Sequence, residues 1–200
     1  KLNSNYKVMK IQSKIALLFI SIFLMINTQA QDIELKIGDQ VKPFIAQADN
    51  GKVWKSYKVV GKKNLVVYFY PAAMTGGCTK QACAYRDSKD DLSGLDAEVV
   101  GVSGDEVRNL DVFKRAHDLN FTLLSDPEGK IAKQFGVPVK EGEKSIERTL
   151  DGTPYILKRD ITTARWTFII DKKGKLVYKS TEVNAAEDSK AVIAILKSLN

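Results

Sequence analysis

The segment that most constrains the fold is residues 65–86, LVVYFYPAAMTGGCTKQACAYR, which contains both cysteines of the chain. Its first six residues are apolar or aromatic, which is typical of a strand buried on both faces. A turn follows Pro71, and we expect a helix to begin near Gly76 or Gly77, with Cys78 in its first turn. A helix N-terminus stabilises a thiolate because its free N–H groups and its dipole favour negative charge. The segment therefore predicts a strand, a turn and a helix that activates Cys78.

The spacing of the two cysteines favours redox chemistry over a permanent disulfide. In an intact helix, the Cα atoms of Cys78 and Cys83 would lie about 8.6 Å apart, with the side chains in different directions. A disulfide needs a Cα separation below about 7 Å, so the pair can bond only if the helix unwinds locally. One structural bridge is the ordinary reading of two cysteines in an exported protein. However, a loop this small would constrain little of the unfolded chain.

The rest of the chain alternates strands with helices. A hairpin with an Asn-Gly turn is expected over residues 44–54. Asp126 is expected to cap a helix that starts at Pro127 and ends at Gly136. The segment 137–163 is less regular, with a plausible hairpin turn at Asp151-Gly152. Buried-type strands are further expected at 98–103, 121–124, 165–170 and 175–179, and amphipathic helices at 105–119 and 185–199.

This order of elements predicts an α/β fold of the thioredoxin-like kind. We expect a central mixed β-sheet with helices on both faces and an N-terminal β-hairpin. In open α/β sheets, functional sites lie beyond the carboxyl ends of the central strands. Tyr70-Pro71 is such an end, and Cys78 follows it shortly.

The N-terminal residues have the three-part layout of a signal peptide. Four lysines precede an apolar run of 12 residues, 15–26, and the small residues Thr28 and Ala30 allow cleavage before Gln31. The run is shorter than the roughly 20 residues that span a bilayer, although an uncleaved membrane anchor is the alternative. We therefore expect an exported, periplasmic protein that meets the membrane only through its leader, with a single domain at residues 31–200.

The charge of the chain gives no support to nucleic-acid binding. The formal net charge of +7 includes four lysines and no acidic residue in positions 1–30. The remaining 170 residues carry 27 basic and 24 acidic side chains, a net charge of +3 that is spread along the sequence. No basic run with interleaved aromatic residues is present, so a nucleic-acid partner is not expected.

The cysteine segment resembles a known family. The run from Pro71 to Cys78, PAAMTGGC, matches the PxxxTxxC motif of peroxiredoxins. A second cysteine five residues later, Cys83, resembles the bacterioferritin-comigratory-protein, or PrxQ-type, subgroup of the AhpC/TSA superfamily. Further stretches similar to the family are VVGVSGDE at 99–106, FTLLSDPEGKIAKQFGV at 121–137 and RWTFIIDKKGKL at 165–176, so the resemblance covers essentially the whole mature chain.

The resemblance implies an activity and a role for each motif residue. Members are thiol peroxidases that need no cofactor or metal, reduce hydrogen peroxide or organic hydroperoxides, use a thioredoxin-like reductant and are often monomers. It implies that Cys78 is the peroxidatic cysteine and that Cys83 is the resolving one. Thr75 would hydrogen-bond the peroxide and the thiolate, and Pro71 would shield the sulfur from water. Arg165 would stabilise the thiolate and orient the peroxide with its guanidinium fork.

Two departures from the family pattern stand out. The subgroup usually has a proline at the position of Gly76, so we expect a floppier turn that unwinds more easily. The segment 139–164 is longer than in compact members and has no assigned role.

Each motif residue also has an ordinary structural reading when it is taken alone. Pro71 could end a strand, Thr75 could cap a helix and Arg165 could form a surface ion pair. Two other functions are alternatives. An exported thioredoxin-like disulfide oxidoreductase would normally carry C-x-x-C, and CTKQAC is wider. A copper-binding assembly protein would need a distant histidine, whereas His117, the single histidine, lies in the middle of the chain.

Overall fold

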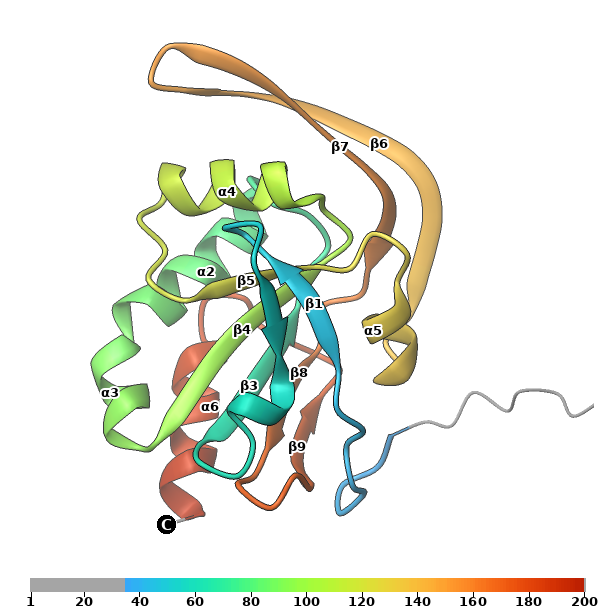
Figure 1. The fold of residues 1–200 in the computed structure, drawn as a ribbon. Helices are drawn as coiled ribbons and strands as arrows, with labels where there is room; N and C mark the ends of the chain where they lie inside the picture. Colours follow the sequence, from blue (N-terminus) through green and yellow to red (C-terminus); the bar gives the residue numbers. More distant parts are fainter. Residues whose placement is uncertain (1–34, 200) are drawn as a thin grey trace, which may run out of the picture. The chain divides into compact units, whose positions relative to one another are not determined.

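A computed structural model describes residues 35–199 of the chain (Figure 1). The expected signal peptide, residues 1–30, lies outside the described residues, so its cleavage and the domain boundary at residue 31 stay predictions. Within residues 35–199, no helix is both long enough and apolar enough to cross a bilayer.

Seven strands form one mixed sheet with the order β2-β1-β5-β4-β3-β8-β9. β3, β4 and β5 run parallel to one another, and the other neighbours pair antiparallel. The expected mixed sheet and N-terminal hairpin are thereby confirmed. The strands are β1 (Ile45–Ala48), β2 (Val53–Lys55), β3 (Asn64–Phe69), β4 (Ala97–Ser103), β5 (Thr122–Ser125), β8 (Thr167–Ile170) and β9 (Leu176–Ser180).

Helices cover both faces of this sheet, as expected. Every residue of β3 is buried, because alternate side chains of the strand enter two different cores. Val66 and Tyr68 pack with α2, α3, α4 and α6, whereas Val67 and Phe69 pack with α5. These helices are α2 (Gly76–Asp87), α3 (Lys89–Gly94), α4 (Val107–Ala116), α5 (Lys130–Gln134) and α6 (Asp188–Ser198), and a 3-10 helix η1 (Ser56–Lys58) follows β2.

The segment that the sequence left irregular is a long β-hairpin. β6 (Val139–Leu150) and β7 (Thr153–Thr163) pair antiparallel, and the expected turn at Asp151-Gly152 is confirmed by positive φ angles of 50° and 75°. The expectation of irregular structure was wrong. Charged residues are mixed with apolar ones along both strands, so the sequence lacks the regular apolar alternation that predicts a strand. Leu157, Arg159 and Ile161 are buried on one face of β7, while the residues between them are exposed.

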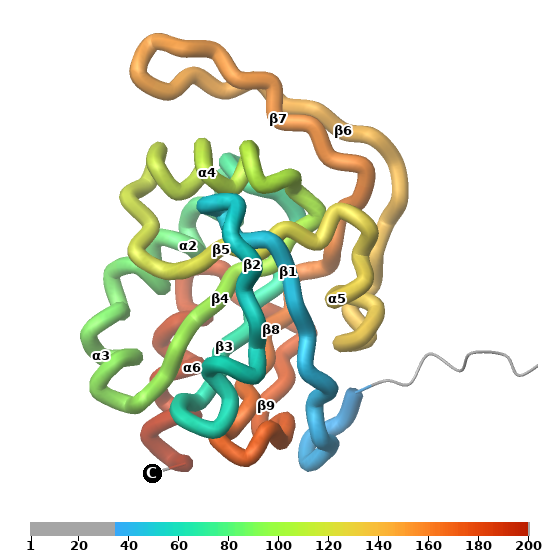
Figure 2. The backbone as a smooth tube through the Cα atoms, in the orientation of Figure 1, coloured from blue at the N-terminus to red at the C-terminus, as the bar shows by residue number. Residues whose placement is uncertain are grey.

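The β6–β7 hairpin arches over α4 (Figures 1 and 2). Asn109 of α4 donates a side-chain hydrogen bond to the carbonyl of Lys158 at 2.7 Å. The Arg108 guanidinium lies 5.7 Å from the centre of the Tyr155 ring, a cation–π distance. These contacts dock the hairpin onto α4.

The expected start of the helix after β5 was also wrong. α5 begins at Lys130, because Asp126, Pro127 and Glu128 form a turn that Gly129 closes with a left-handed φ of 66°. Asp126 nevertheless caps the helix, since its carboxylate accepts the N–H groups of Ile131 and Ala132 at 3.1 and 2.9 Å.

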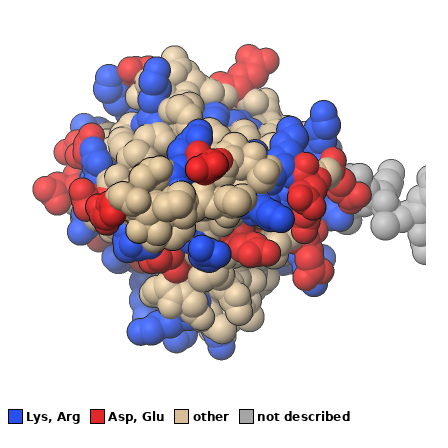
Figure 3. Space-filling model, turned by 90° about the horizontal axis from the view of Figure 1, so that it is seen from above, with Lys and Arg blue, Asp and Glu red and all other residues tan. Residues whose placement is uncertain are grey.

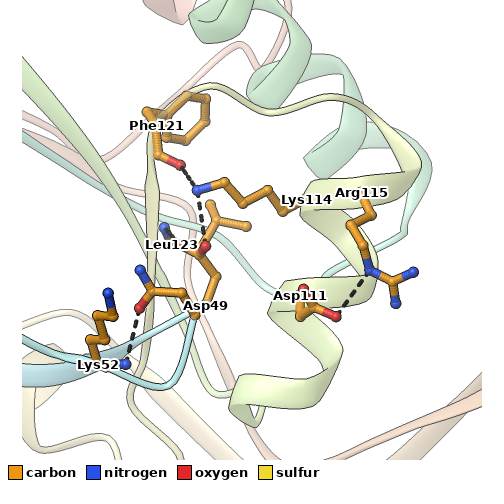
Figure 4. A network of polar contacts seen from close by, with 8 residues as sticks. Asp49, Lys52, Asp111, Lys114, Arg115, Phe121 and Leu123 are labelled. Atoms are coloured by element: carbon orange, nitrogen blue, oxygen red, sulfur yellow. Dashed lines mark hydrogen bonds and ion pairs between the residues drawn. The ribbon is translucent and has the colours of Figure 1, made fainter.

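A buried carboxylate fastens the N-terminal hairpin to the rest of the sheet (Figure 4). Asp49 lies in the β1–β2 turn and accepts the N–H of Leu123 in β5 at 2.8 Å. Its second oxygen lies 2.9 Å from Lys114 Nζ of α4, which also donates to the carbonyl of Phe121 at 2.8 Å. The contacts satisfy a carboxylate that is only 5% exposed.

The surface on the hairpin side carries both signs of charge. In the view of Figure 3, basic and acidic side chains are interspersed with uncharged ones over the whole face, including near its centre.

The docking of the hairpin can be tested at Gly104. A Cβ atom at this position would clash with the Ile161 side chain and lie 2.7 Å from the Ile161 carbonyl oxygen. We expect Gly104→Ala to lower the free energy of unfolding by about 2 kcal/mol, as overpacking does.

Gly94→Ala is the matched control, since a Cβ there meets open space. In urea unfolding it should leave stability unchanged or raise it by up to about 1 kcal/mol. Equal effects of the two variants would contradict the docked hairpin.

Candidate active site

Cys78 lies at the start of α2, directly beyond the carboxyl end of β3. Thr75 is the N-cap residue and Cys78 is the third residue of the helix, with 2% of its surface exposed. The Thr75 side chain makes no cap hydrogen bond, and the first turn contains no acidic residue. The N-terminal N–H groups and the helix dipole are therefore available to stabilise a negative sulfur.

Arg165 reaches this sulfur from a segment 87 positions away in the sequence. Its Nη2 donates to Cys78 Sγ at 3.3 Å, and its Nη1 donates to Gln81 Oε1 at 2.5 Å. The approach follows from the sheet, because β8 pairs with β3 and the Phe69 N–H bonds to the Trp166 carbonyl at 2.8 Å. The structure thus brings together Cys78 and Arg165, two of the residues expected in the site.

The turn that precedes the helix is held from outside by two side chains. The Ala73 N–H donates to Asp105 Oδ2 at 2.7 Å, and Arg148 Nε of β6 donates to the Met74 carbonyl at 2.9 Å. Met74 itself has a positive φ of 60°, which is unusual for a residue other than glycine. The contacts restrain the turn ahead of Gly76, where a looser backbone was expected, and they give the β6–β7 hairpin a structural link to the site.

The Thr75 hydroxyl is oriented by the same turn. Its Oγ1 donates to the Ala72 carbonyl at 2.9 Å. With this proton engaged, the oxygen retains lone pairs that can accept a hydrogen bond from a ligand. The side chain occupies the N-cap position without capping the helix.

Pro71 is half-buried and follows a residue whose backbone is fixed on both sides. The Tyr70 N–H bonds to the Val102 carbonyl at 3.1 Å, and the Tyr70 carbonyl accepts the Thr163 hydroxyl at 3.0 Å. These bonds set the position from which Pro71 starts the turn.

Cys83 lies in the second turn of the same helix and is half-buried. Both thiols are free, and α2 is continuous from Gly76 to Asp87. The helical separation of about 8.6 Å between the two Cα atoms therefore applies to this state. The structure represents the reduced form in which the thiols are apart.

Two neutral tyrosines lie in the same buried cluster as the Cys78 thiol. Tyr68 and Tyr70 are fully buried beside Cys78 in the same core, with ring centroids 5.4 Å apart. Burial raises the pKa of both phenols well above the usual range, and the charge of Cys78 adds to the rise. Both uncharged phenols thus belong to the buried cluster that contains Cys78.

Asp105 supports the turn as a buried carboxyl. Burial raises its pKa, while hydrogen bonds from Ala73 and Ser103 and the positive charge of Arg159 oppose the rise. Arg159 of β7 is itself 8% exposed. The hairpin therefore places one guanidinium near Asp105 and another, from Arg148, on the turn.

The sequence did not reveal the residues that support the site. Gln81 could have been found, because a residue three positions after Cys78 shares its helix face. Asp188, whose carboxylate binds Gln81, and Arg148 lie far along the chain and carry no local signal. Within the described part of the chain, no group of three or more potential ligands could hold a metal.

A buried thiol at a helix start, with a guanidinium on its sulfur and a second thiol five residues on, defines a thiol-based redox enzyme. Comparisons with known proteins identify the family. Residues 37–179 match the model of the AhpC/TSA family.

Curated relatives cover most of the chain. The putative peroxiredoxin bcp of Haemophilus influenzae is 37% identical over 166 residues, which is 82% of this chain and 98% of that protein. Peroxiredoxin Bcp of Escherichia coli K12 is 36% identical over 82% of this chain and 96% of its own length. The crystal structure of peroxidoxin BcpB from Mycobacterium tuberculosis superposes with a TM-score of 0.70 and 32% identity, covering 84% of this chain and 99% of that one.

The chain therefore belongs to the AhpC/TSA family. Its relatives place it with the Bcp/PrxQ-type peroxiredoxins, which are thiol peroxidases of thioredoxin-like fold.

The two glycines at the helix start provide a test of the Arg165 contact. A Cβ on Gly77 would lie 3.3 Å from Arg165 Nη2, whereas a Cβ on Gly76 would meet open space. Both replacements by alanine favour the helix equally. We expect Gly77→Ala to slow the reaction of Cys78 with peroxide about fivefold or more, because small displacements of a reacting group are costly.

Gly76→Ala is the control and should stay within about twofold of the wild type. Both rates are measured by stopped flow in a Cys83→Ser background, which isolates the first step. Equal rates in the two variants would contradict a close guanidinium.

A second test uses the raised pKa of Asp105. A carboxyl with a raised pKa binds its proton more tightly in the folded state, so its contribution to stability falls as pH rises from about 4 through the folded value. Asp105→Asn lacks this titration. In urea unfolding between pH 4 and 7, the stability of the wild type relative to Asp105→Asn should be greatest at acid pH. A relative stability that grows with pH would mean that the pKa is lowered instead.

Proposed function

We propose that this chain reduces hydrogen peroxide or organic hydroperoxides by a two-cysteine cycle in which Cys78 is peroxidatic and Cys83 is resolving. The observation that carries the proposal is the Arg165 guanidinium, 3.3 Å from the Cys78 sulfur at a helix N-terminus. The arrangement suits a nucleophilic thiolate, because both partners favour the ionised sulfur.

The first step is attack of the Cys78 thiolate on one oxygen of the peroxide. A sulfur–oxygen bond forms and the O–O bond breaks, so the sulfur is oxidised to sulfenic acid and the peroxide is reduced. The second oxygen leaves as alkoxide or hydroxide and takes up a proton.

Arg165 would stabilise the charge that develops along the O–O bond. The Thr75 hydroxyl donates its proton to the Ala72 carbonyl, so its oxygen would accept a hydrogen bond from the peroxide O–H. Pro71 would limit the access of water.

The second step joins the two cysteines. The Cys83 sulfur attacks the sulfenic sulfur, a disulfide forms, and the oxygen leaves as water with the thiol proton. The step requires α2 to unwind between Gly76 and Asp87, because an intact helix holds the Cα atoms beyond disulfide reach. No further cysteine exists in the chain to take this role.

The cycle closes when an external dithiol reduces the Cys78–Cys83 disulfide. We propose a thioredoxin-like donor, which exchanges two thiols for the disulfide. If residues 1–30 direct export and are removed, the donor must itself be exported and supplied with electrons across the membrane, since an oxidising compartment lacks a reducing thiol pool. We propose that the exported protein is a monomer, which sedimentation analysis tests.

Stoichiometric peroxide titration with thiol counting tests the assignment. Wild type should lose two thiols per peroxide and form an intramolecular disulfide. Cys83→Ser should still consume one peroxide and accumulate a sulfenic acid that dimedone traps, because the first step needs only Cys78.

Cys78→Ser should not consume peroxide. Undiminished consumption by this variant would contradict the assignment of Cys78 as the peroxidatic cysteine. A disulfide oxidoreductase, the alternative function, would instead exchange disulfides with a peptide substrate faster than it consumed peroxide.

A further inference from the structure

A buried carboxylate on the C-terminal helix binds three side chains with one oxygen. Asp188, the first residue of α6, is 4% exposed. Its Oδ2 accepts Gln81 Nε2 at 2.7 Å, the Tyr85 hydroxyl at 2.7 Å and the Thr167 hydroxyl at 2.8 Å. Gln81 and Thr167 have no exposed surface, and Tyr85 has 1%. Such charge-assisted bonds in a dry core are among the stronger polar contacts in a protein.

Two of these partners lie on α2 and bracket the second cysteine. Gln81 and Tyr85 are four residues apart, so they share one face of the helix, with Cys83 midway between them in sequence. Asp188 therefore ties the helical turn that carries Cys83 to α6. Ser88 Oγ adds a bond to Ser189 Oγ at 3.1 Å at the end of the same helix. Burial, and then the charge of Asp188, raise the pKa of Tyr85, which keeps its phenol a proton donor.

The same contact orients the group that holds Arg165. Asp188 is an acceptor, so it selects the NH₂ end of the Gln81 amide and turns Oε1 toward Arg165 Nη1. Arg165 Nη2 then meets the Cys78 sulfur. A line of hydrogen bonds runs from α6 through Gln81 and Arg165 to the reactive thiol.

From this geometry we infer that Asp188 is a positioning residue with opposite effects on the two steps of the cycle. Through Gln81 and Arg165 it speeds the reaction of Cys78 with peroxide. Through Gln81 and Tyr85 it holds α2 folded and slows the formation of the Cys78–Cys83 disulfide. The inference rests on the proposed two-cysteine cycle. In that cycle, the contacts of α6 with α2 set the lifetime of the Cys78 sulfenic acid before Cys83 attacks it.

The test measures the two steps separately in Asp188→Ala. Peroxide consumption is followed in a Cys83→Ser background, and disulfide formation after a peroxide pulse is followed with both cysteines present. We expect the first rate to fall about tenfold and the second to rise about tenfold, as loss of a bond to a buried charge implies. Asp188→Asn keeps an acceptor oxygen without the charge, so it should shift both rates in the same directions but less.

Tyr85→Phe separates the two effects. It removes one bond between α2 and Asp188 but leaves the Gln81 contact that orients Arg165. Disulfide formation should therefore rise several-fold, while the first rate stays within about twofold. Val192→Ala is the matched control for a loosened α6, because Val192 is fully buried on the same helix in an apolar environment.

The outcomes decide between the inference and simple destabilisation. If Val192→Ala, at equal loss of stability in urea, reproduces the opposed rate changes, general loosening explains them and the inference is overturned. It is also overturned if Asp188→Ala moves both rates in one direction. If wild type forms no Cys78–Cys83 disulfide, the proposed function fails and takes the inference with it. If wild type forms the disulfide but the Asp188 variants do not change the two rates in opposite directions, only the inference fails.

Discussion

The contact between the Arg165 guanidinium and the Cys78 sulfur is the interaction on which the site depends. Cys78 is only 2% exposed, so a thiolate at this position would depend on the protein to balance its charge. In the proposed mechanism, the start of α2 and the guanidinium both lie where they would balance that charge. The contact requires β8 to lie beside β3, and a Cβ atom at Gly77 would lie only 3.3 Å from the Arg165 Nη2 that makes it. The order of the strands and the local sequence at Gly77 thus both contribute to the contact between Arg165 Nη2 and Cys78 Sγ.

The site combines a restrained turn with a helix that has to unwind in the proposed two-cysteine cycle. Asp105 and Arg148 fix the turn before α2, and Arg148 is one of the residues through which the β6–β7 hairpin contacts the site. Asp188 fixes the turn of α2 that carries Cys83. Rigidity favours the reaction with peroxide, because an oriented guanidinium is preorganised for the developing charge. In the proposed cycle the same rigidity would oppose disulfide formation, so the stability of α2 would balance the two steps.

Features with a local sequence pattern could be predicted, and features made by distant contacts could not. The apolar run of β3, the Asn-Gly turn of the first hairpin and the helix start at Gly76 follow from neighbouring residues. Resemblance to the family motif predicted Cys78, Cys83, Thr75, Pro71 and Arg165 as site residues. The strands of β6 and β7 were missed because charged residues interrupt their apolar alternation. The start of α5 was missed because Gly129 turns left-handed. Asp188 binds Gln81 across 107 positions and Arg148 binds Met74 across 74, which no local pattern records.

The central claim is that α2 is a closed helix in the reduced protein and must open for Cys78 to meet Cys83. Hydrogen–deuterium exchange of the backbone amides of residues 79–87, compared between the reduced and the peroxide-oxidised protein, measures this directly. The account predicts strong protection in the reduced protein and fast exchange once the disulfide has formed, with the amides of β3 protected in both. Equal protection of α2 in the two forms, with the Cys78–Cys83 disulfide present by mass spectrometry, would contradict it.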